Sequence, residues 1–174
     1  MYIPASTAET RPAVLHALMT AYPLGMLVSH AAGGLDADHI PFDIAPDAAP
    51  LGVLRAHVAR ANPLWRNDGG AVMVVFRGES GYVPPRASMR HPGDTRVVPT
   101  WNYSVVHAHG RLRTVDDPAW IMALLRRQSA VHEAAESQPW SPDDAPSDYI
   151  DRLLKAIVGI EIVIERLDGK IKSG

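Results

Sequence analysis

Residues 100–114 read TWNYSVVHAHGRLRT, a stretch in which side chains of two kinds alternate. Successive side chains of a β-strand point to opposite faces of the sheet, so alternation predicts one long strand here. One predicted face carries Tyr103, Val105, His107, His109 and Arg111, and the other carries Val106, Ala108, Gly110 and Leu112.

Shorter apolar runs on either side of this stretch are separated by glycine, proline and asparagine turn signals. The runs are Leu24–His30, Leu35–Ile44, Leu51–Ala59, Ala71–Arg77, Gly81–Val83 and the alternating segment 158–165. Close spacing of this kind favours an antiparallel meander or barrel over βαβ units. The fold class predicted is therefore mainly β with flanking helices (α+β).

Three helices are expected around the strands. The first spans Thr7 to Tyr22, with Pro12 near its start, and the last spans Asp148 to Ala156. The middle helix follows Asp116 or Asp117 as its cap, because Pro118 suits a first turn. Its expected apolar stripe is Trp120, Leu124, Leu125 and Val131. The segment 84–96, rich in proline and arginine, is predicted to be a mobile loop.

Composition bounds the classes of protein that fit. The 174 residues suit one domain spanning 1–174, and a net charge of -2 gives no general attraction to DNA or to anionic membranes. The absence of cysteine excludes disulfides and thiol chemistry. No apolar run reaches the roughly 20 residues that span a bilayer, and the N-terminus lacks the pattern of a signal peptide. A cytoplasmic protein is expected, with no membrane partner.

The segment from His57 to Trp65 places a guanidinium and an amide close together where a strand gives way to a turn. Arg60 can pair with a phosphate through two parallel hydrogen bonds, and Asn62 can bond to a hydroxyl chain. The alternative is that Asn62 and Pro63 only form the turn and that Arg60 is simply exposed. Local chemistry leaves both interpretations open.

The start of the long strand carries a second polar and aromatic group, Thr100-Trp101-Asn102. An indole beside an amide offers a flat surface and directional hydrogen bonds to a planar heterocycle. The alternative is that these aromatic residues are anchors of the core or of an interface. A third candidate is a metal site at His107 and His109, for which His132-Glu133 is the tempting source of a further ligand, although hydrogen-bonded structural histidines are the more usual interpretation.

Taken together, motifs along the whole chain resemble the PaiB-type family of FMN-binding negative transcriptional regulators. The motifs with the highest specificity are His57-Val58-Ala59-Arg60-Ala61-Asn62-Pro63 and Val98-Pro99-Thr100-Trp101-Asn102-Tyr103. The resemblance implies an FMN-binding split β-barrel, pyridoxamine-phosphate-oxidase-like, that forms a homodimer with ligand sites at the subunit interface.

The resemblance also implies which residues bind the cofactor. His57, Arg60 and Asn62 would approach the phosphate and ribityl chain of FMN, and Thr100, Trp101 and Asn102 would lie near its ring. The chain departs from the family pattern at Pro85–Met89, where an aromatic segment is usual, and past Gly169-Lys170, where a longer tail is usual and this sequence has Lys172-Ser173-Gly174. Both departures predict that FMN binds weakly or not at all.

The function implied is transcriptional regulation of degradative-enzyme and sporulation genes. No helix-turn-helix pattern is present and the net charge is -2, so a protein partner is favoured over direct contact with DNA. The alternative is a flavin-dependent oxidoreductase of a small substrate, since in such enzymes the flavin itself carries the redox chemistry.

Overall fold

The computed structural model describes residues 1–31, 33–89, 91 and 95–173. Within them, every strand joins one antiparallel sheet in the order β3-β2-β6-β7-β8-β5-β4, and β1 pairs with β8. The strands are β1 (Ala8–Glu9), β2 (Leu24–Ala31), β3 (Gly34–Pro41), β4 (Asp43–Ala45), β5 (Val53–Ala59), β6 (Ala71–Val83), β7 (Thr100–Val115) and β8 (Ile157–Lys172). The helices are α1 (Pro12–Ala21), α2 (Pro118–His132) and α3 (Ser147–Leu154). The predicted class, mainly antiparallel β with flanking helices, is confirmed.

The core lies inside this curved sheet, and one face of each long strand builds it. On β7 the side chains in the core cluster are Val106, Ala108 and Leu112, as the alternation predicts, and Ile160 and Ile162 of β8 lie beside them. Helix α1 packs Leu15 and Met19 into the same cluster. Alternation therefore fixes which face of each strand is buried.

Three predicted boundaries are wrong, and strand pairing explains each. The first helix begins at Pro12 rather than Thr7, because residues 8–9 pair with Gly169 and Lys170 of β8. The run 35–44 divides at Phe42: its first part pairs with β2 and its last with β5. The final strand continues to Lys172 because β7 supplies partners along its whole length.

The two runs 71–77 and 81–83 form one strand, β6. A register shift between Arg77 and Ser80 absorbs the intervening residues, so pairing with β7 resumes on the far side. This irregularity is a β-bulge, which lets a strand bend without ending. In the predicted loop 84–96, residues 85–88 form a 3-10 turn, and residues 90 and 92–94 lie outside the described residues.

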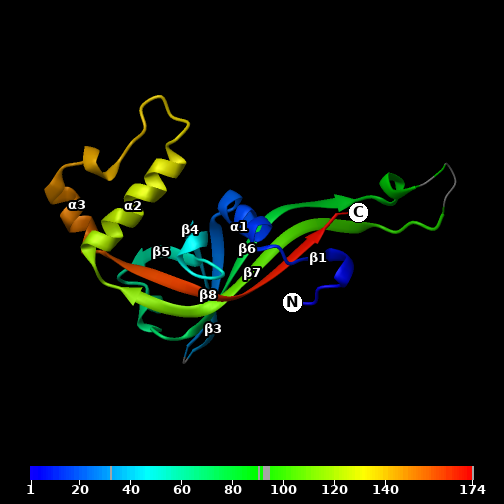
Figure 1. The fold of residues 1–174 in the computed structure, drawn as a ribbon, viewed down its shortest axis with the longest axis horizontal. Helices are drawn as coiled ribbons and strands as arrows, with labels where there is room; N and C mark the ends of the chain where they lie inside the picture. The colour runs from blue at the N-terminus through cyan, green and yellow to red at the C-terminus, as the bar shows by residue number, and fades with distance from the viewer. Residues whose placement is uncertain (32, 90, 92–94, 174) are drawn as a thin grey trace.

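Helices α2 and α3 cover one end of the barrel (Figure 1). Of the two aspartates expected as the cap, Asp117 caps α2 by accepting a hydrogen bond from the Ala119 amide. The predicted stripe is only partly right, because Ile121 is buried with Leu124 whereas Val131 is 65% exposed. In α3, Ile150 is buried but Leu153 is 45% exposed. Both helices thus leave apolar surface uncovered.

At the opposite end, β6 and β7 extend beyond the barrel as a two-stranded arm (Figure 1). We call residues 79–83 and 100–104 the β6–β7 arm. The end of β8 joins it, since Lys172 pairs with Tyr103. No helix among the described residues is long and apolar enough to cross a membrane.

Candidate functional site

Arg60 lies just after β5, where it is held by several acceptors. Its Nε donates to the Lys155 carbonyl at 2.9 Å, and its two terminal nitrogens donate to the Asp116 carboxylate at 3.0 and 2.6 Å. One of these nitrogens also donates to the Ile157 carbonyl at 3.1 Å. The side-chain hydrogen bonds raise the pKa of Arg60 and lower the pKa of Asp116. The guanidinium is thus oriented by backbone and already binds one oxyanion.

Asn62 joins two parts of the barrel that are distant in sequence. Its Nδ2 donates to Oδ1 of Asp38 on β3 at 2.7 Å, and its Oδ1 accepts from the Leu64 amide at 2.8 Å. The second bond caps the 3-10 turn Pro63–Arg66. Asn62 therefore has the structural role that the sequence left open, and one Nδ2 hydrogen remains for a further acceptor.

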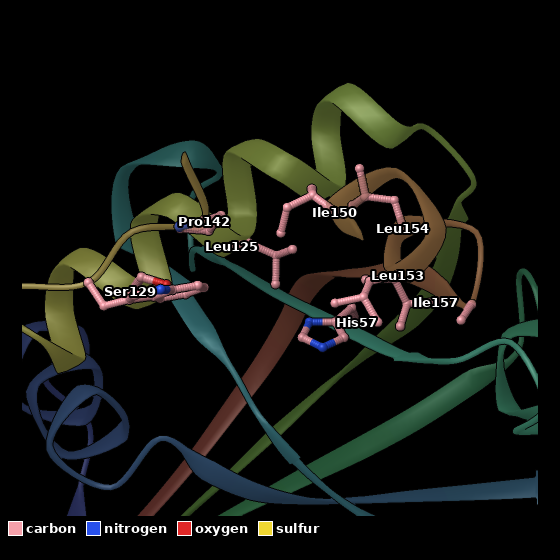
Figure 2. Close-up of a pocket in the computed structure, with 10 residues that line it drawn as sticks. His57, Leu125, Ser129, Pro142, Ile150, Leu153, Leu154 and Ile157 are labelled. Carbon is pink, nitrogen blue, oxygen red and sulfur yellow. The ribbon is translucent and has the colours of Figure 1, made fainter. Parts of the chain in front are cut away.

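His57 lies on the outer face of β5, beneath α2 and α3 (Figure 2). Its imidazole lines a cavity of about 300 Å³ together with apolar side chains of both helices. Nδ1 is buried and has no hydrogen-bond partner within the described part of the chain. Burial lowers the pKa of His57 below the ordinary 6.5.

Thr100, Trp101 and Asn102 all lie on the β6–β7 arm. Trp101 is 55% exposed and packs edge-to-face on Tyr82, with ring centroids 6.0 Å apart. Thr100 accepts a hydrogen bond from the Lys172 ammonium at 2.5 Å. Asn102 lines an open depression with Lys172 and Ser80. The arm thus presents aromatic and polar groups side by side.

The structure brings the predicted residues together as two groups, not one. Arg60 contacts Asp116, which follows the end of β7, whereas Trp101 lies near the start of that strand. A strand of 16 residues spans about 50 Å. The group around Arg60 and the group around Trp101 therefore lie at opposite ends of the folded molecule.

His107 and His109 share one face of β7, as predicted, with ring centroids 6.2 Å apart. Nε2 of His109 lies 3.2 Å from the Asp168 carboxylate on β8, which also pairs with Arg166. His132 lies elsewhere, at the end of α2 beside Phe42. In the parts of the chain described here, no three His, Cys, Asp or Glu side chains gather in a way that could hold a metal ion.

Burial lowers the pKa of His107 and of His109 as well as that of His57. The unfolded chain therefore binds more protons than the folded chain as pH falls through 6.5, the ordinary value. We expect the urea midpoint to fall between about pH 7 and pH 5.5, before most carboxylates titrate. The variant His57→Gln should show a smaller fall, and a midpoint that rises on acidification would contradict this prediction.

Sequence reasoning missed the partners of the predicted residues. Asp38 of β3 bonds to Asn62, just after β5, at a separation of 24 residues. Asp116, just before α2, bonds to Arg60 at a separation of 56 residues. The sequence pattern around Asp116 predicts only a helix cap, and nothing local to Lys172 predicts its contact with Thr100. A charge of opposite sign is the only local signal for such pairs, and many other residues carry it.

The fold is a split barrel of the pyridoxamine-phosphate-oxidase-like class, since solved structures described as "Putative pyridoxamine 5'-phosphate oxidase" share it at 14% identity with TM-scores of 0.50 and 0.52. Residues 1–166 match the family model described as "Putative FMN-binding domain". The chain belongs to this FMN-binding domain family.

Individual proteins agree with the assignment. An uncharacterized protein of Emericella nidulans is 32% identical, over 99% of this chain and 83% of its own length. The "Protease synthase and sporulation protein PAI 2" of Bacillus subtilis is 26% identical, over 99% and 81%. The flavocytochrome Anf3 of Azotobacter vinelandii shares the fold with a TM-score of 0.73 at 16% identity, over 99% of this chain and 73% of that one.

Proposed function

We propose that this protein is a cytoplasmic, homodimeric transcriptional regulator that binds FMN in clefts between its two copies. The observation that carries the proposal is the separation of the two groups. Arg60 and Asn62 lie at one end of the chain, and Thr100, Trp101 and Asn102 lie on the arm at the other. One FMN molecule is too short to contact both groups of a single chain. A two-fold pair places the arm of each copy on the barrel of the other.

The chemistry at Arg60 suits the phosphate end of FMN. Backbone carbonyls of Lys155 and Ile157 fix the guanidinium, and its two terminal nitrogens each donate to one oxygen of the Asp116 carboxylate. A phosphate offers the same paired oxygens with more charge. Because the ion pair with Asp116 is exposed at the surface, it contributes little stability and can open for such an anion.

The arm suits the flavin ring and the dimer. Tyr82 and Trp101 are 54% and 55% exposed and pack on one another, so the arm leaves adjacent apolar surface in water in a single chain. A flat heterocycle or the barrel of a second copy would cover it. Bound FMN would supply redox chemistry, while the residues of this chain bind and orient it. His57, which the resemblance assigns to the same site, borders the cavity beneath α2 and α3.

Regulation is supported by the similarity to the Bacillus subtilis sporulation protein. With a net charge of -2, the chain is expected to act through a protein partner rather than by gripping DNA. The second candidate, a flavin oxidoreductase, is favoured by the shared fold with a flavocytochrome. Reduction of bound FMN by NADH or NADPH under anaerobic conditions would favour the second candidate, and inertness toward both would favour the first.

The direct test combines flavin binding with mass in solution. We expect FMN titrated into the protein at equilibrium to lose fluorescence and to show a shifted visible spectrum. Sedimentation should give twice the 18.9 kDa chain mass. A stable monomer, or flavin whose fluorescence and spectrum stay unchanged at all protein concentrations, would refute the proposal.

A further inference from the structure

A second site lies beneath α2 and α3, apart from the arm. The cavity of about 300 Å³ is bounded by β5 below, by the start of β8 and by the two helices above (Figure 2). This volume is at the lower end of the range for pockets that hold small organic molecules. Its walls include Leu125, Ile150 and Leu153.

The cavity favours a neutral guest. Among the described residues, none of those lining it is Lys, Arg, Asp or Glu, and its polar side chains are His57, Ser129 and the indole of Trp140. An ion placed against such walls would lose its hydration without gaining a counter-charge. A phosphorylated ligand such as FMN therefore does not suit this cavity as a whole.

His57 is the lining residue that lacks a hydrogen-bond partner. Its imidazole lines the cavity, yet Nδ1 is buried and makes no hydrogen bond within the described residues. A buried polar atom in this state costs free energy until a partner arrives. Burial also lowers the pKa of His57, so the ring is neutral near pH 7 and offers one donor and one acceptor. A small turn about its Cβ–Cγ bond, which is a soft torsion, presents either nitrogen to a guest.

Trp140 and Leu153 show that the walls are incompletely covered. They line the cavity and are still 48% and 45% exposed. Large apolar side chains at this exposure gain most from an apolar guest that displaces water from them. The indole of Trp140 additionally favours an aromatic guest through ring contacts.

We propose that the cavity beneath α2 and α3 binds a small, neutral aromatic molecule that carries one hydroxyl group, with His57 as its hydrogen-bond partner. This guest differs from FMN because none of the described side chains that line the cavity is charged, although Leu154 lines both the cavity and the neighbouring depression that contains Arg60. It would give this protein a second ligand, which would contact α2, α3 and the start of β8.

The test uses three probes of one shape and different polarity: 2-naphthol, naphthalene and 2-naphthoate. We expect calorimetric titration at pH 7 to show 2-naphthol binding tightest, naphthalene weaker by about tenfold for want of one hydrogen bond, and the charged 2-naphthoate weakest. Naphthoate binding as tight as naphthol, or no binding of 2-naphthol up to its solubility limit, would overturn the proposal.

Variants locate the site. His57→Phe should weaken 2-naphthol by about tenfold and leave naphthalene within about twofold, whereas His30→Phe, at an exposed position of β2, should change neither. Equal effects of the two substitutions would place the probe elsewhere. FMN should not compete with 2-naphthol; competition would make the cavity part of the flavin site and overturn its separateness.

Discussion

Replacement of Phe76 by alanine is expected to lower the free energy of unfolding by about 3–5 kcal/mol. Phe76 is fully buried in the centre of β6 and packs edge-to-face on Phe42, with ring centroids 5.7 Å apart. Removing the ring forfeits its burial and leaves a cavity among rigid strands that cannot collapse into it. The measurement is urea unfolding followed by circular dichroism.

Two further substitutions make this result specific. Phe76→Leu keeps most of the apolar volume and should cost less than half as much as alanine. Leu35→Ala, at a side chain 78% exposed, should change the free energy by no more than about 0.5 kcal/mol. A loss at Leu35 as large as that at Phe76 would mean that the buried set described here is not the core.

A mixture of two variants that each bind FMN weakly is expected to recover strong FMN binding. Arg60→Ala removes the phosphate partner and Trp101→Ala removes the ring partner, and each alone should weaken FMN by about tenfold or more. If each cleft takes Arg60 from one copy and Trp101 from the other, a mixed dimer has one cleft with both groups intact. Refolding the two variants together at equal amounts should restore about a quarter of the wild-type binding capacity, because half the dimers are mixed and each has one good site of two.

The control is the double variant carrying both substitutions in one chain, mixed with either single variant. The double variant supplies neither Arg60 nor Trp101, and each single variant lacks one of the two. No dimer in these mixtures therefore contains a complete cleft, and FMN binding should not return. If the two single variants together also recover nothing, while each still forms dimers, the cleft does not combine these groups across copies and the proposed site is wrong.

The period of the sequence predicted much of the fold. Alternation over residues 100–114 predicts the core-facing side of β7, and Asp116 or Asp117 followed by Pro118 predicts the start of α2. These features depend on neighbours along the chain, since strand alternation and helix capping are local. Errors arose where pairing between distant strands overrode local pattern, as at residues 8–9 and at the division of 35–44.

The candidate site shows the same division more sharply. Residue types alone made Arg60 and Asn62 interesting, because a guanidinium and an amide have definite partners wherever they lie. Only the tertiary structure shows that Arg60 bonds to Asp116 and that Asn62 bonds to Asp38. It also shows that the start of β7, where Trp101 lies, is at the far end of the molecule (Figure 1).

The cavity at His57 likewise depends on how α2 and α3 lie over β5. By itself, the sequence determined which residues form strands, which faces are apolar and which side chains carry polar chemistry. The tertiary structure decided which of those side chains meet. The physical reason is that strand order and helix placement minimise the energy of the whole core, and no short segment contains that information.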